Sequence, residues 1–70
     1  MHKYEVIIYW SEEDQLFIAE VPELPGCIAD GDSANGALAS CQEAMDLWLD
    51  TARELGRPVP VPKGRRLQYA

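Results

Sequence analysis

Residues 34–55 read ANGALASCQEAMDLWLDTAREL, and this stretch decides how the rest of the chain can fold. Its apolar residues recur every three or four positions over about six turns, which is the spacing of a helix with one apolar side. They are Ala37, Leu38, Cys41, Ala44, Met45, Trp48, Leu49, Ala52 and Leu55. Asp32 and Ser33 offer N-cap oxygens before the stretch, while Gly56 and Pro58 mark its end. The pattern predicts one long amphipathic helix that covers a core.

Three short runs before this helix favour β-strands, because they are rich in apolar, β-branched and aromatic residues. They cover residues 4–10, 15–21 and 27–30. A polar stretch at residues 11–14 joins the first two runs. Pro25 and Gly26 join the second and third with the residues that a type II turn prefers, since glycine takes the positive φ. Links this short make neighbouring strands antiparallel.

The chain after the helix has a different character. A proline stands at every second position from 58 to 62, which excludes a helix and favours an extended polyproline conformation. We expect residues 67–69 to form a short final strand. The predicted fold is therefore α+β, with the order β-β-β-α-β, an antiparallel sheet and one long helix on one face. We expect one domain over residues 1–62 and a basic tail over residues 63–70.

One helix covers only one face of such a sheet, so a second apolar face is left over. A contiguous apolar patch on a small protein usually marks an interface, and a chain of 70 residues has a thin margin of stability by itself. We therefore expect a homodimer or higher homo-oligomer that forms through the second face or the final strand. The expected interface residues are Ile7, Tyr9, Leu16, Ile18, Leu67 and Tyr69.

The net charge of −6 is unevenly distributed. Residues 1–52 hold eleven acidic side chains and one basic one, whereas residues 53–70 hold one acidic and five basic side chains. An acidic body repels phosphate backbones, so we expect no direct nucleic-acid binding from this chain. No apolar run approaches the roughly 20 residues of a membrane helix, and no secretory leader is evident, so we expect a cytoplasmic protein without a membrane association.

The polar side of the predicted helix carries a stripe of acidic residues spaced three or four apart. We call it the acidic stripe, and its members are Glu43, Asp46, Asp50 and Glu54. Like charges at this spacing weakly repel one another. Two interpretations fit: a surface that steers and binds a basic protein partner, or a solvated face that keeps a small protein soluble.

Few residues in the sequence suggest metal binding or catalysis. Two cysteines and one histidine cannot supply the four ligands of a structural zinc site without carboxylates, so we expect small buried cysteines and neither a metal nor a cofactor. Glu20, Asp30 and Asp32 raise the alternative of a two-metal nuclease, which needs carboxylates that converge on one site. Asp32 fits a helix cap better, and we expect no enzymatic activity.

Several segments combine into a recognisable pattern. Residues 17–27 read FIAEVPELPGC, residues 29–33 read ADGDS, and residues 56–62 read GRPVPVP. Together with the helix between them, these segments resemble the HicB-like antitoxin family, particularly its short members. The resemblance covers nearly the whole chain.

The resemblance implies a partial RNase H-like fold without catalysis of its own. It also implies a partner, a HicA-type toxin, which is a small basic ribonuclease that cleaves messenger RNA and is silenced by binding. Longer members continue into a DNA-binding domain, which we do not expect in a chain that stops at Ala70. The resemblance favours the acidic stripe as a partner surface. The alternative is a stand-alone homo-oligomer with a regulatory or ligand-binding role and no toxin partner.

Overall fold

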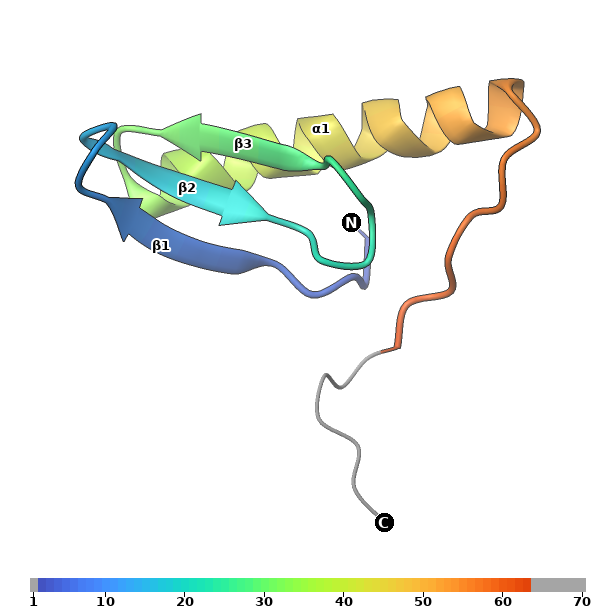
Figure 1. Ribbon diagram of the computed structural model, residues 1–70, viewed down its shortest axis with the longest axis horizontal. Coiled ribbons are helices and arrows are strands. Elements are labelled where there is room, and N and C mark those ends of the chain that lie inside the picture. The colour runs from blue at the N-terminus through green and yellow to red at the C-terminus, as the bar shows by residue number, and fades with distance from the viewer. Residues whose placement is uncertain (1, 64–70) are drawn as a thin grey trace, which may run out of the picture.

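The computed structural model describes residues 2–63, which form an antiparallel three-stranded sheet followed by one long helix. The elements are β1 (Ile7–Ser11), β2 (Leu16–Glu20), β3 (Ile28–Gly31) and α1 (Ala34–Glu54), and the strand order is β1-β2-β3 (Figure 1). The predicted α+β meander with a helix after it is confirmed. The final strand predicted at residues 67–69 lies outside the described residues.

The first strand begins three residues later than the sequence pattern predicts. β2 pairs with β1 only as far as the partners Ile7 and Glu20, and Pro22 beyond it has no N–H to donate. The chain before Ile7 packs elsewhere: the Tyr4 side chain is only 8% exposed, and its hydroxyl donates a hydrogen bond to the Pro60 carbonyl. Residues 4–6 therefore belong to the core without belonging to the sheet.

Both turns have a clear local cause. At the hairpin, Gln15 takes a positive φ of 56°, and its backbone N–H donates to the Ser11 carbonyl at 2.8 Å, so the loop lies one residue later than predicted. At the second turn, Gly26 has a φ of 82° and the Cys27 N–H donates to the Leu24 carbonyl at 2.9 Å. This geometry confirms the predicted type II turn.

The helix is capped at both ends by residues flanking it. The Ser33 hydroxyl accepts a hydrogen bond from the Gly36 N–H at 3.0 Å, so Ser33, and not Asp32, is the N-cap. At the other end Gly56 takes a φ of 68°, and the Arg57 N–H reaches back to the Ala52 carbonyl at 2.8 Å. That bond closes a Schellman motif, which a left-handed glycine permits.

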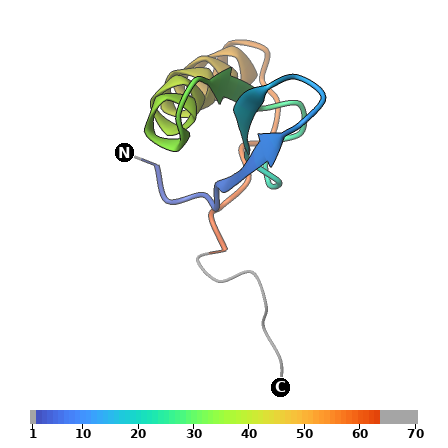
Figure 2. The same ribbon diagram turned by 90° about the vertical axis from the view of Figure 1, so that its left-hand side faces the viewer.

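The core lies between α1 and the sheet, and the helix covers one face only (Figure 2). The predicted apolar stripe supplies the helical half of the core through Ala37, Cys41, Met45, Leu49 and Ala52, all buried. Leu55 is the exception, because it follows the last helical turn as the C-cap and is 60% exposed. Burying a side chain the size of Met45 contributes about 1.5–3 kcal/mol.

Gly31 marks the closest approach of sheet and helix. A Cβ at this position would lie 2.5 Å from the Ala37 nitrogen and 2.7 Å from the Gly36 carbonyl carbon, both of them backbone atoms. Only glycine lets the end of β3 come this near to the first turn of α1. This contact fixes the helix over β3.

The segment after the helix turns back along the molecule. It leaves the far end of α1 and runs toward the N-terminal residues (Figure 1). The Pro60 carbonyl accepts from Tyr4, and the Lys63 N–H donates to a Glu23 carboxylate oxygen at 3.4 Å. Proline-rich backbone stays extended over this distance without needing hydrogen bonds of its own.

Candidate protein-binding surface

All four members of the acidic stripe are exposed on the side of α1 that faces away from the sheet: Glu43, Asp46, Asp50 and Glu54. The side chains of Asp46 and Asp50 are 68% and 72% exposed. The His2 ring contacts Asp46 at 2.5 Å, and Arg53 lies 3.5 Å from Asp50. Exposed ion pairs of this kind are weak. The stripe therefore keeps its negative potential and remains accessible to another molecule.

One apolar residue in the middle of this surface is not among the predicted interface residues. Leu47 lies four residues after Glu43 and three before Asp50, so it shares their side of the helix, and it is 69% exposed. The signal was present in the sequence, since a leucine on the polar side of an amphipathic helix breaks the pattern. A large exposed apolar side chain within a charged stripe offers apolar area that a binding partner can bury.

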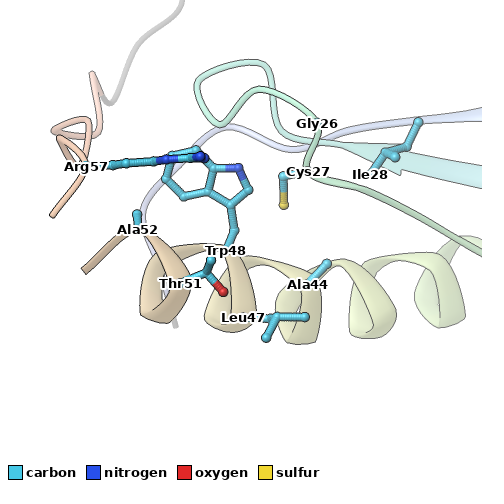
Figure 3. A pocket seen from close by; sticks show the side chains of 9 residues that line it. All are labelled: Gly26, Cys27, Ile28, Ala44, Leu47, Trp48, Thr51, Ala52 and Arg57. Carbon is cyan, nitrogen blue, oxygen red and sulfur yellow. The ribbon is translucent and has the colours of Figure 1, made fainter. Parts of the chain in front are cut away.

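Beside Leu47 the surface is hollowed into a groove of about 320 Å³ between α1 and the chain around the second turn (Figure 3). Its lining includes Cys27, Ala44, Leu47, Trp48 and Arg57. The Trp48 ring stands up from the helix toward the turn, and its indole N–H donates to the Pro25 carbonyl at 2.9 Å. The groove is thus largely apolar, and its aromatic wall is held in place.

The face of the sheet opposite α1 carries the four described residues predicted for an oligomer interface. Side chains alternate along a strand, and Ile8 and Ala19 pack on the helix side, so their neighbours point the other way. In register, Tyr9 lies opposite Ile18, and Ser11 opposite Leu16, while Ile7 pairs with Glu20.

Exposure on this far face is uneven. Tyr9 is 44% exposed, whereas Ile18 on the central strand is 8% exposed, because strands flank it on both sides. Glu20 and Asp30 share the face, so it is less apolar than the sequence pattern suggests. Leu67 and Tyr69, the other two predicted interface residues, lie outside the described part of the chain.

The two cysteines are buried in the core and carry free thiols. Burial raises the pKa of the Cys27 thiol, and the neighbouring Cys41 raises it further. Burial also raises the pKa of Cys41, partly offset by a hydrogen bond with Cys27. A raised pKa keeps a thiol protonated and unreactive at neutral pH, so these residues act as small apolar side chains.

The carboxylates considered for a two-metal nuclease do not converge on one site. Asp30 and Asp32 are exposed and Glu20 is half-buried, with Glu20 and Asp30 at different register positions of the sheet. Within residues 2–63, no three side chains among His, Cys, Asp and Glu come close enough to hold a metal ion. Within the same residues, α1 does not have the apolar sequence that a membrane-spanning helix requires.

The chain resembles known proteins over most of its length. The chain matches the family model of the HicB-like antitoxin of bacterial toxin-antitoxin systems over residues 4–68. This protein therefore belongs to the HicB-like antitoxin family.

Two relatives support this membership. The chain is 37% identical over 57 residues to the UPF0150 protein ssl0259 of Synechocystis, covering 81% of this chain and 77% of the relative. It is 33% identical over 58 residues to the UPF0150 protein Ta0767 of Thermoplasma acidophilum, covering 83% of each chain. No solved structure matches the chain significantly.

Proposed function

We propose that this protein is an antitoxin that binds and neutralises a HicA-type ribonuclease toxin, without enzymatic activity of its own. The observation that carries the proposal is the acidic stripe on the exposed side of α1, and membership of the HicB-like antitoxin family supports its interpretation as a toxin-binding surface. A basic ribonuclease must expose positive charge to hold RNA, and a negative helix face competes for that charge.

The physical support for this proposal is that the acidic side chains are carried by a rigid helix. Asp46 and Asp50 project from a helix that is capped at both ends and seated on the sheet, so the charges are presented in a fixed array. Fixed charges lose less conformational freedom on binding than charges on a loop. The array is therefore better suited to a protein surface than to a small ligand.

The direct test measures RNA cleavage by the purified HicA-type toxin from the same genome while this protein is titrated in. The proposal predicts that cleavage stops near one binding equivalent and that the two proteins elute together in gel filtration. Cleavage that continues unchanged with a large excess of the protein, together with separate elution, contradicts it.

We propose as a second candidate a stand-alone homo-oligomer assembled through the far face of the sheet. Tyr9, which is 44% exposed, favours it, since it is a large apolar residue on a strand of that face. Light scattering at about ten times the concentration used for the toxin assay tests whether the oligomer forms, and the toxin assay tests whether it lacks a toxin partner. A dimer mass that the substitution Tyr9→Lys reduces to a monomer supports the oligomer, and a monomer mass throughout contradicts it.

A further inference from the structure

The groove beside α1 is a preformed cavity in the described part of the chain. Trp48 is tied to the Pro25 carbonyl, Cys27 is fixed by its hydrogen bond to Leu24, and Arg57 is fixed by its bond to Ala52. One side-chain bond therefore holds the Trp48 ring, and two backbone bonds hold the chain at Cys27 and at Arg57. A cavity with fixed walls loses little freedom when it is filled.

The size of the groove limits what can fill it. A volume of about 320 Å³ lies at the lower end of the range for small-molecule sites, and the groove is open to solvent along α1 (Figure 3). The described residues that line the groove include two titratable side chains, Cys27 and Arg57, and the rest are apolar or neutral. The shape therefore suits one or two apolar side chains projecting from another protein.

The charges around the groove limit further which kind of partner can fill it. Leu47 forms one edge, and Glu43 and Asp50 lie beside it on the same exposed side of the helix. Arg57 also lines the groove, and its side chain lies on the Trp48 side, away from Leu47 (Figure 3). An apolar side chain that enters here is best flanked by basic residues on the Leu47 side. The acidic body of a second copy is a poor fit, because residues 1–52 hold eleven acidic side chains against one basic one.

We propose that the Leu47–Trp48 groove receives an apolar side chain from the basic surface of the toxin, with the acidic stripe pairing with the cations around it. This inference rests on the proposed function, and it assigns the binding anchor to a leucine and a groove. Charge then governs how fast the partner arrives, and the filled groove governs how long it stays.

Two leucines allow a matched test. Leu47 is 69% exposed and lines the groove, whereas Leu55 is 60% exposed and does not line it. Substitution to alanine at either position removes the same atoms from an exposed site, so neither variant should fail to fold. The dissociation constant for the HicA-type toxin should rise about tenfold in Leu47→Ala, through faster dissociation, and stay within about twofold in Leu55→Ala.

A spectroscopic readout locates the contact. The chain has two tryptophans, so the ¹⁵N-labelled protein gives two indole resonances, which Trp10→Phe assigns. Unlabelled toxin should shift the Trp48 indole resonance and leave that of Trp10, on the hairpin strand β1, nearly unchanged.

The outcomes separate this inference from the proposed function. If the toxin binds but both leucine variants bind equally and the Trp48 resonance stays fixed, the groove is not the anchor and the antitoxin function stands. If the wild-type protein does not bind the toxin, both proposals fall. A Trp48 shift on raising the protein concentration alone shows that a second copy fills the groove, which also overturns the inference.

Discussion

The substitution Gly31→Ala probes the contact that fixes the helix on the sheet. The added Cβ would lie 2.5 Å from the Ala37 nitrogen, and ordinary contact begins near 3.4 Å, so strand and helix must separate by about 1 Å. The obstructing atoms belong to the backbone, so no side-chain rotation relieves the clash. Overpacking of this kind costs about 1–3 kcal/mol, and we expect the upper half of that range.

This loss is large for so small a domain. At 0.05–0.15 kcal/mol per residue, the free energy of unfolding of a chain this size is roughly 4–10 kcal/mol. With a urea m-value of about 1 kcal/mol/M, a loss of about 2–3 kcal/mol lowers the urea midpoint by about 2–3 M. The assay is urea unfolding followed by circular dichroism and by tryptophan fluorescence, and the two midpoints should coincide.

Gly56→Ala is the matched control. Gly56 has a φ of 68° and no atom within 4 Å of an added Cβ, so only the left-handed conformation is penalised, at about 1 kcal/mol. Gly31 is penalised by crowding instead. A Gly31→Ala midpoint no lower than that of Gly56→Ala would refute the close approach of β3 and α1.

Three further predictions concern local contacts. Ser33→Ala should lower the free energy of unfolding by about 1 kcal/mol because it removes the N-cap, and Asp32→Ala should lower it far less; equal losses in urea unfolding would contradict the assignment of the cap. Trp48→Phe should cost about 1 kcal/mol by leaving the Pro25 carbonyl without its donor, and a thermal melt unchanged from wild type would argue against that bond. Burial raises the pKa of both cysteine thiols above their ordinary value of 9.0, so the stability they contribute is complete below that pH and is lost as pH rises above it. The urea midpoint should fall above about pH 9, and less steeply in Cys27→Ala/Cys41→Ala; parallel falls would show that other groups cause the effect.

Local signals were sufficient to predict the order of the described elements, three strands followed by one helix. The helix could be located from its apolar spacing together with Gly56, because the period of 3.6 and a left-handed terminator act within one segment. The turn at Gly26 was predictable for the same reason, since a type II turn needs a positive φ at one residue.

Features that depend on distant segments were not predictable. Residues 4–6 have strand composition, but β2 ends at Glu20 and leaves them no partner, and Tyr4 bonds to Pro60 far along the chain instead. Which of two candidate residues caps the helix depends on backbone geometry: Ser33 has the extended φ and ψ that aim its hydroxyl at Gly36.

The charged residues of the candidate site could be predicted from the sequence, but the groove beside them could not. The acidic stripe could be read from the spacing of its members along the helix. The groove needed the structure, because Trp48 and Cys27 come from different elements and meet only when the turn folds over α1. The spacing grouped Trp48 with the core-facing residues, although it also forms the wall of an open groove.

The central claim is that the acidic stripe on α1 receives a basic protein partner. The most direct measurement is the association rate constant with the HicA-type toxin at low and at high salt, for the wild type and for Asp46→Lys/Asp50→Lys. The claim predicts that the wild-type rate falls steeply with salt, and that the variant associates at least about tenfold more slowly at low salt with little salt dependence. Equal rates with equal salt dependence would show that the stripe is only a solvated face and would contradict the claim.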